Sequence, residues 1–117
     1  MPSTTSYKQG DVVLVPFPFT DLTATKQRPA LVISTDAINS RGGDVVLLAI
    51  TSQIPPTLLP DQYMIPATDQ QGCGLPKTSL IKLAKVITLY QSLVVKRLGS
   101  LPKATLDRVL SQFRLQF

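Results

Sequence analysis

Three polar segments lie beside apolar runs in this chain, and each carries side chains that could do chemistry. Residues 26–29 (KQRP) place Arg28 before a proline, which keeps the preceding backbone extended and so defines the direction of the arginine. Residues 51–53 (TSQ) follow an apolar run, so three hydrogen-bonding side chains leave the core together. Residues 72–77 (GCGLPK) lack the glycine spacing of a phosphate-binding or dinucleotide-binding loop. Taken singly, these segments have simpler interpretations: a solvated arginine, a strand-ending Ser/Thr turn and a hairpin turn.

The composition excludes several kinds of catalytic site. The chain has no His and no Glu, which excludes His-based acid–base catalysis, Ser-His-Asp triads and nearly all zinc sites. Its seven Asp are scattered, so the sequence predicts no metal site and no cofactor. Cys73 is the only cysteine and cannot form an intramolecular disulfide, so we expect an inert thiol in a reducing cytoplasm.

The charge of the chain is unbalanced. Twelve Lys and Arg oppose seven Asp, which gives a net charge of +5. This excess suits a polyanionic partner, either a nucleic acid or an acidic protein segment, although a merely soluble basic surface would give the same count. Lys82, Lys85, Lys96 and Arg97 could line a basic surface, but the default expectation for such residues is a solvated charged face.

The 117 residues are enough for a single domain with a real core, and the apolar runs predict its strands. Strands are expected at residues 12–15, 29–34, 44–50 and 62–65, with a further short strand within 92–98. The connections are expected to be a polar loop over residues 20–28 and turns over residues 39–43 and 68–75.

The two ends of the chain differ in pattern. Residues 1–9 are polar and predict a flexible segment that is not a signal peptide. Leu106, Val109 and Leu110 share one helical face with Phe113, which predicts a helix over about 102–114. The longest nearly apolar stretch, residues 12–19, is too short to span a bilayer.

Residues 79–89 (SLIKLAKVITL) give two conflicting signals. Their polar positions 79, 82, 85 and 88 recur every three residues, a period closer to that of a helix than to that of a flat strand. The β-branched residues among them favour a strand. The pattern alone leaves both structures open.

The three polar segments together are more specific than any one alone. The runs GDVVLVPFPFTDLTATKQRPALVIS, AITSQ and GLPKTSLIKLAKVITL resemble the MazF/PemK family of toxins from type II toxin–antitoxin systems, over roughly residues 10–100. The resemblance implies a β-rich α+β fold, an SH3-like β-barrel of the MazF/CcdB type with a C-terminal α-helix. It also implies a bent strand at residues 79–89.

The family resemblance also implies an activity. Most members are endoribonucleases (mRNA interferases) that cut single-stranded RNA without a ribosome. Members are usually homodimers, and their antitoxin partners carry an acidic, disordered tail that occupies the RNA groove. The expected protein is therefore a cytoplasmic, RNA-binding hydrolase that an acidic antitoxin neutralises.

The family's site residues carry over by position. The arginine before the Pro-Ala-Leu-Val-Ile strand is Arg28, and the hydroxyl at the end of the third strand is Thr51; both are expected to be catalytic. The residues expected to bind RNA are Thr20, Asp21, Thr25, Lys26, Gln27, Ser52, Gln53 and Lys77. Some members place a carboxylate in the middle of the strand after the Gly-Leu motif, where this chain has Ala84. A mechanism that uses that carboxylate as general base has no support here.

RNA carries its own nucleophile, because its 2′-hydroxyl lies next to the scissile phosphate. An enzyme that aligns this group needs neither a metal nor a protein nucleophile. The Arg28 guanidinium and the Thr51 hydroxyl would stabilise the charge that builds on the phosphate oxygens. Arginine is a poor proton carrier because its pKa exceeds about 12, so the general base and acid stay open among water, Asp21 and a lysine.

Two other functions remain compatible with the sequence. One is a non-enzymatic toxin on the same fold, like the related gyrase-binding CcdB, in which the C-terminal helix would make the contacts. The other is an inactive barrel that binds RNA or an antitoxin, to which Ala84 points.

Overall fold

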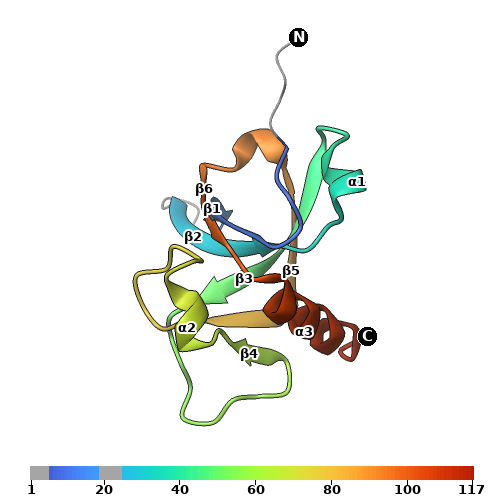
Figure 1. The fold of residues 1–117 in the computed structure, drawn as a ribbon. Helices are drawn as coiled ribbons and strands as arrows, with labels where there is room; N and C mark the ends of the chain where they lie inside the picture. Colours follow the sequence, from blue (N-terminus) through green and yellow to red (C-terminus); the bar gives the residue numbers. More distant parts are fainter. Residues whose placement is uncertain (1–5, 19–24) are drawn as a thin grey trace.

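A computed structural model describes residues 6–18 and 25–117 of the chain. Its described strands form one antiparallel sheet in the order β4-β5-β3-β2-β1-β6 (Figure 1). The strands are β1 (Asp11–Pro18), β2 (Thr25–Val32), β3 (Asp44–Thr51), β4 (Gln62–Met64), β5 (Leu80–Tyr90) and β6 (Lys96–Ser100). Three α-helices and a short 3-10 helix complete the described structure: α1 (Asp36–Asn39), α2 (Ala67–Gln70), α3 (Lys103–Arg114) and η1 (Gln91–Leu93). The β-rich α+β class with a C-terminal helix is confirmed.

The sheet is bent and open. Among the described residues, no hydrogen-bonded ladder joins β4 to β6, the two ends of the strand order. Its regular pairing is interrupted between Val12 and Val13 and again between Leu48 and Ala49. Such bulges bend a strand and increase its twist. The predicted barrel is therefore seen as a curved sheet without closure.

Both faces of the central strands are buried, which explains their nearly continuous apolar runs. Val12, Leu31 and Leu48 belong to one apolar cluster, which includes residues of α3. Their chain neighbours, among them Val13 and Leu47, belong to a second cluster. Successive side chains of a strand point to opposite faces, so alternate residues of β1, β2 and β3 build two cores.

The predicted polar loop was wrong at its C-terminal end. Residues 25–28 are the first half of β2, paired with residues 15–18 of β1. These residues looked like a loop because all four are polar and the last of them precedes a proline. They form a strand because β1 continues through Pro16 and Pro18 as a two-stranded ribbon beyond the last β6 pair, Leu14↔Lys96. A proline is tolerated on such an unpaired edge.

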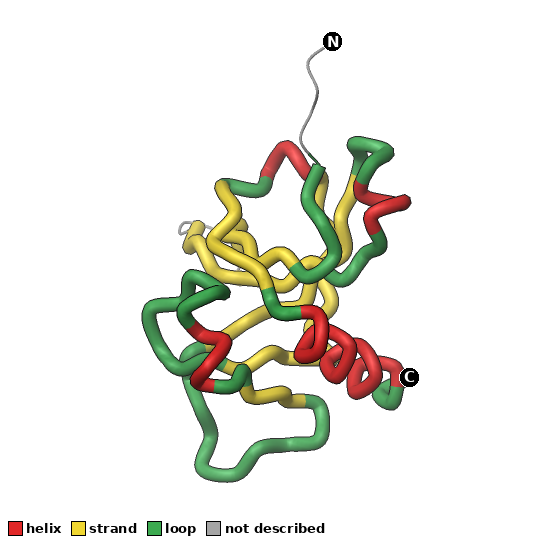
Figure 2. The backbone as a smooth tube through the Cα atoms, in the orientation of Figure 1, coloured by secondary structure: helices red, strands yellow, loops and turns green. Residues whose placement is uncertain are grey.

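The two short helices and one strand boundary also differ from the sequence prediction. Helix α1 precedes the predicted turn at residues 39–43, and α2 occupies part of the predicted turn at residues 68–75 (Figure 2). Helices of one turn are too short to show a period. The predicted strand within 92–98 begins later, as β6, because η1 occupies residues 91–93.

The C-terminal helix is where the sequence placed it. Leu106 and Val109 of α3 are buried, and Leu110 and Phe113 pack against the same apolar cluster. Pro102 directly precedes the helix, where its missing N–H leaves no bond unmade. No helix in the described part of the chain is long and apolar enough to cross a membrane.

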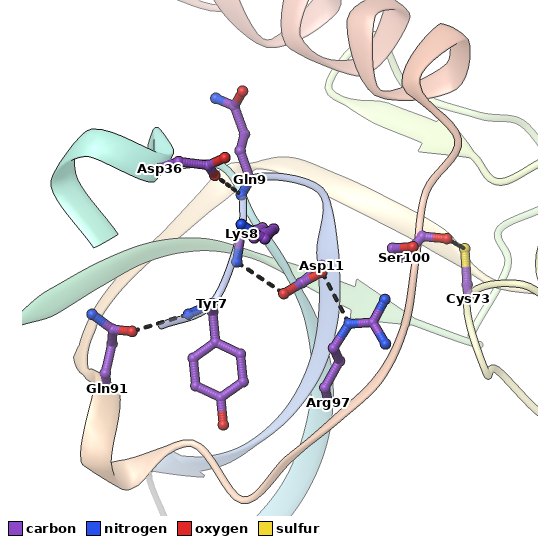
Figure 3. Close-up of polar contacts among 9 residues, drawn as sticks. All are labelled: Tyr7, Lys8, Gln9, Asp11, Asp36, Cys73, Gln91, Arg97 and Ser100. Carbon is purple, nitrogen blue, oxygen red and sulfur yellow. Dashed lines mark hydrogen bonds and ion pairs between the residues drawn. The ribbon is translucent and has the colours of Figure 1, made fainter. Parts of the chain in front are cut away.

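Tyr7 and Gln9 make hydrogen bonds to distant segments (Figure 3). The Tyr7 backbone N–H donates to the Gln91 side chain at 3.3 Å, and the Gln9 N–H donates to Asp36 at 2.8 Å. Asp11, at the start of β1, accepts from Arg97 at 3.0 Å. Of the N-terminal segment expected to be flexible, residues 1–5 lie outside the described part of the structure.

Candidate RNA-binding groove

A groove of about 580 Å³ lies where β2 begins and β3 ends. Its walls come from β1, β2, β3, β5, β6 and the turn between α2 and β5. The lining residues are Leu14, Arg28, Pro29, Ala49, Ile50, Thr51, Ser52, Gln53, Gly74, Leu75, Pro76, Lys77, Ser79, Lys82, Lys85, Lys96 and Leu98. The groove thus contains residues from all three polar segments that the sequence singles out.

The sheet register brings Arg28 and Thr51 together. Ala30 on β2 pairs with Ala49 on β3. Because the strands are antiparallel, two steps along each of them lead to Arg28 and Thr51, which stand opposite each other if this register continues. Residues two apart on a strand share a face, so both side chains project on the side of the two alanines. These alanines are small, which leaves room in front of the two polar groups.

The hydroxyl of Thr51 is oriented by the chain that follows it. The Gln53 backbone N–H donates to the Thr51 Oγ1 atom at 3.1 Å. A hydroxyl has two acceptor sites and one O–H donor, so this bond leaves the donor for another acceptor. The strand-ending Ser/Thr turn expected from the sequence is therefore present, and it is compatible with a hydroxyl that donates into the groove.

Glycines bring the turn after α2 against β6, and this contact forms part of the groove. A Cβ atom on Gly99 would lie 2.2 Å from the Gly72 carbonyl oxygen, and one on Gly74 would lie 2.1 Å from the Leu98 oxygen. Gly74 also has a φ of 69°, which residues with a Cβ rarely adopt. Farther along the turn, the Ser79 hydroxyl donates to the Lys77 carbonyl oxygen at 2.8 Å. The conformation of the turn therefore positions Lys77 at the groove.

Positive charge is concentrated in the groove. Its lining includes five cations, Arg28, Lys77, Lys82, Lys85 and Lys96, and none of the described aspartates. The other seven Lys and Arg equal the seven Asp of the whole chain in number. The groove therefore holds the equivalent of the whole net charge of +5, which favours a polyanionic ligand over a merely soluble basic surface.

The groove gathers some of the expected site residues and not others. Besides Arg28 and Thr51, it includes Ser52, Gln53 and Lys77. The expected RNA-binding residues Lys26 and Gln27 are exposed on β2 and lie outside the described lining. Thr20 and Asp21 lie outside the described residues, and Thr25 is described only as the first residue of β2.

Three lysines of the groove were expected to lie on a solvated charged face. Lys82, Lys85 and Lys96 line the groove. Arg97, considered with them, instead makes a 3.0 Å ion pair with Asp11. The signal in the sequence was the three-residue spacing of residues 82 and 85, which suggested a helix because it does not fit a regular strand.

Cys73 lies behind the groove and not in it. The thiol is buried, and its Sγ atom is 3.8 Å from the Ser100 carbonyl oxygen (Figure 3). Burial raises the pKa of the Cys73 thiol to about 11, and the nearby negative charge of Asp69 adds to this effect. Such a thiol is a poor nucleophile at neutral pH. Within the described ranges, no three His, Cys, Asp or Glu side chains gather where they could hold a metal ion.

Known proteins resemble this chain in sequence and in fold. It is 32% identical over 85 residues to the endoribonucleases MazF6 of Mycobacterium tuberculosis and MazF2 of Mycobacterium bovis, covering 72% of this chain and 72% of each relative. Among solved structures, an endoribonuclease in complex with its cognate antitoxin from a mycobacterial species superposes with a TM-score of 0.76 at 19% identity, over 94% of this chain and 93% of that one. A MazE–MazF structure from Deinococcus radiodurans gives a TM-score of 0.74 at 21% identity, over 96% of each chain.

The match to a protein family covers nearly the whole chain. Residues 8–117 match the family described as the PemK-like, MazF-like toxin of type II toxin–antitoxin systems. This range includes every described strand and all of the groove. The chain belongs to the PemK-like, MazF-like family of type II toxins.

Proposed function

We propose that this protein is a toxin endoribonuclease whose groove binds single-stranded RNA and cuts it by attack of the RNA's own 2′-hydroxyl. Membership of the toxin family and the endoribonuclease relatives support the activity. The observation that carries the site is the groove itself, in which Arg28 of β2 and Thr51 at the end of β3 lie together with four lysines. A groove of this charge attracts a phosphate backbone along its length.

In the proposed reaction the 2′-oxygen forms a bond to the adjacent phosphorus, and the bond from phosphorus to the 5′-oxygen breaks. The products are a 2′,3′-cyclic phosphate and a 5′-hydroxyl. Arg28 donates hydrogen bonds to the phosphate oxygens as their charge grows, and the Thr51 hydroxyl adds a further donor. The Gln53 N–H orients the Thr51 hydroxyl before the substrate arrives, which lowers the reorganisation needed in the transition state.

Two proton transfers accompany the reaction. The 2′-hydroxyl loses a proton, and the leaving 5′-oxygen gains one. Ala84 offers no carboxylate for either transfer, so the candidates are water, Asp21 and a lysine such as Lys77. Arg28 is assigned to charge stabilisation because a guanidinium holds its proton at neutral pH.

We propose that cleavage needs no metal ion. In many phosphoryl transfers a divalent cation neutralises charge on the phosphate. Here five cationic side chains converge on the groove and can supply that charge. The remaining predicted contacts, Thr20, Asp21, Thr25, Lys26, Gln27, Ser52, Gln53 and Lys77, are proposed to bind the RNA on either side of the cut.

The proposed partner is an antitoxin with an acidic segment that competes with RNA for the groove. Structures similar to this chain include an endoribonuclease with its cognate antitoxin and MazE–MazF complexes. A strand of carboxylates would match the charge of the groove as phosphates do. We further propose that the chain is a single domain, that the curved sheet is its form of the family's SH3-like barrel, and that it acts as a cytoplasmic homodimer.

The groove supports RNA cleavage better than a gyrase-binding role carried by the C-terminal helix. On α3, Lys103 lies 3.3 Å from the Asp107 carboxylate. Arg108 donates to Tyr63 and to Thr105, at 3.2 Å each. These two cations of the helix are thus engaged within the protein, whereas Lys77, Lys82, Lys85 and Lys96 line the groove.

The experiment that tests the proposed function is digestion of a mixed single-stranded RNA, with and without excess chelator, followed by mapping of fragment ends. We expect cleavage at a short recurring sequence, equal in both samples, and no cleavage of the matching DNA. A sample that binds RNA but never cuts it would favour the inactive RNA-binding alternative. Activity lost to chelator and restored by Mg²⁺ would contradict the metal-free reaction.

A further inference from the structure

Lys82 and Lys85 line the same groove although they are three residues apart on one strand. In a regular strand, residues three apart point to opposite faces of the sheet. The pairing of β5 with β3 explains the exception. Ala49 pairs with Lys82, whereas the preceding residue, Leu48, pairs with Val86. Residues 83–85 are therefore extra residues on β5 with no partner on β3.

This three-residue bulge changes which residues of β5 point to each face of the sheet. Ala49 and its partner Lys82 share one face, and Lys85 returns to that face because it alternates with Val86, the partner of Leu48. On the other edge of β5, the Leu83 N–H donates to the Asp61 carbonyl oxygen at 2.8 Å. Leu83 is also buried. The bulge is thus anchored, and it aims two ammonium groups at one groove.

A third lysine reaches the groove from a strand at the far end of the strand order. Lys96 is the first residue of β6, which is the last strand in the order, whereas β5 is the second. The curvature of the sheet places Lys96 in the same lining as Lys82 and Lys85. In the described part of the chain the ion pairs are Arg97–Asp11 and Lys103–Asp107, so none of the three lysines has a carboxylate partner there.

The three lysines line the groove beside the position of Arg28 and Thr51. Lys82 pairs with Ala49, which is two residues before Thr51 on the neighbouring strand. Standard strand dimensions put the Cα atoms of Lys82 and Thr51 about 8 Å apart. An ammonium on a flexible stem binds phosphate as a point charge, without the fixed fork of a guanidinium. It therefore suits the phosphates that position the RNA better than the one that reacts.

We propose that Lys82, Lys85 and Lys96 form a subsite for the RNA phosphates next to the scissile one. This inference rests on the proposed function and assigns the three lysines to positioning of the substrate. Loss of the subsite raises KM and leaves kcat nearly unchanged, because the reacting phosphate keeps Arg28 and Thr51. The substrate must also be long enough to present a neighbouring phosphate.

The test compares Lys82→Gln/Lys85→Gln and Lys96→Gln with Arg41→Gln, which removes a cation from an exposed turn outside the groove. We expect KM to rise about tenfold for the double variant, with kcat within about twofold, and no change for Arg41→Gln. Lys82→Arg should retain most of the wild-type KM. Unchanged melting temperatures show that the variants are folded.

A second measurement locates the phosphate. Binding is measured with an RNA that carries a single 2′-deoxy sugar at the cleavage site, and each flanking phosphate is replaced in turn by a neutral methylphosphonate. One replacement should weaken RNA binding by the wild-type protein and should have little further effect on RNA binding by the double variant. The slope of log K against log salt concentration should decrease in magnitude by about 0.7 for each lysine removed.

Four results would overturn the assignment. A fall in kcat without a change in KM would make a lysine part of the reacting site. Equal sensitivity of wild type and variant at every flanking phosphate would mean a diffuse charge effect. Normal RNA binding with weakened binding of an acidic antitoxin peptide would assign the lysines to the antitoxin. Arg41→Gln raising KM as much as the groove variants would remove the specificity of the subsite. Each result leaves RNA cleavage by the wild-type protein intact, so it differs from a failure of the proposed function.

Discussion

The proposed chemistry depends on two side chains of different kinds. Arg28 contributes charge and a planar set of donors, whereas Thr51 contributes one hydroxyl whose orientation is set by the Gln53 N–H. The sequence singled out their two segments, and the resemblance to the toxin family assigned the two residues by position. It could not show that β2 and β3 lie side by side and bring both residues into one groove, because strand pairing is a long-range property of the sheet.

We predict that Arg28→Ala lowers the rate of RNA cleavage by about 10²–10³-fold, the usual cost of losing one preorganised donor to the transition state. The residue is exposed, so its removal opens no cavity in the core. The matched control is Arg41→Ala, which removes an exposed arginine outside the groove. Single-turnover cleavage and thermal melting measure the two effects, and wild-type cleavage by Arg28→Ala would show that the assigned site is wrong.

At position 51 a pair of variants separates the hydroxyl from the shape of the side chain. Thr51→Ser keeps the hydroxyl and should retain most of the activity. Thr51→Val keeps the shape but removes both the donor and the acceptor of the Gln53 N–H, and should lose about 10²-fold or more. Equal activities of the two variants would argue against a role for the hydroxyl.

The buried thiol of Cys73 makes the stability of the protein fall as the pH becomes alkaline. The unfolded chain loses this thiol proton near pH 8.5, whereas burial raises the pKa in the folded protein to about 11. The unfolded state therefore binds fewer protons within this window, and the free energy of unfolding falls as pH rises through it. We expect wild type to lose more stability than Cys73→Ala between these two pH values, as measured by urea unfolding. Parallel pH profiles would contradict the raised pKa.

At the scale of elements, long and strongly patterned segments were predictable. The apolar run at residues 44–50 became β3, and the helical face around Leu106 and Val109 became α3. The start of β2 was missed because it pairs only with the end of β1 that extends beyond β6. Residues of such a two-stranded ribbon need no apolar pattern. The three-residue period at residues 79–89 left helix and strand open, since the spacing of Lys82 and Lys85 comes from a bulge that only the partner strand reveals; the bent strand that the family resemblance implied is β5.

The contact between the turn after α2 and β6 leads to a prediction about stability. We expect Gly99→Ala to destabilise the fold by about 1–3 kcal/mol or more, because the added methyl group meets backbone atoms of Gly72 and Cys73. Gly43→Ala is the control, since its Cβ would have nothing within 4 Å. The measurement is thermal unfolding of both variants, and similar melting temperatures would disprove the close contact.

At the scale of the whole molecule, the distribution of charge explains the partners. Beyond the described lining of the groove, seven Lys and Arg remain, as many as the seven Asp of the whole chain, so the excess that attracts polyanions is local. The sequence revealed the excess of +5 but not its location, because cations from three different strands and one turn had to be folded together. RNA and an acidic antitoxin would then compete for one charged surface.

We predict that the affinity for an acidic antitoxin peptide falls as salt rises. Exposed charges are screened over about 8 Å at physiological ionic strength and over about 3 Å at 1 M. Calorimetric titrations at several salt concentrations measure the effect, and RNA should displace the peptide. A peptide that binds equally at low and high salt would indicate an apolar docking site in place of the groove.

The central claim is that the attacking group belongs to the RNA. The most direct measurement uses a short RNA with one mapped cut and a second RNA that is identical except for one 2′-deoxy sugar immediately 5′ of the scissile phosphate. We predict that the first is cut to leave a 2′,3′-cyclic phosphate, identified by mass spectrometry, and that the second is bound but left intact. Cleavage of the 2′-deoxy substrate would show that water attacks instead, and would contradict the roles given to Arg28 and Thr51.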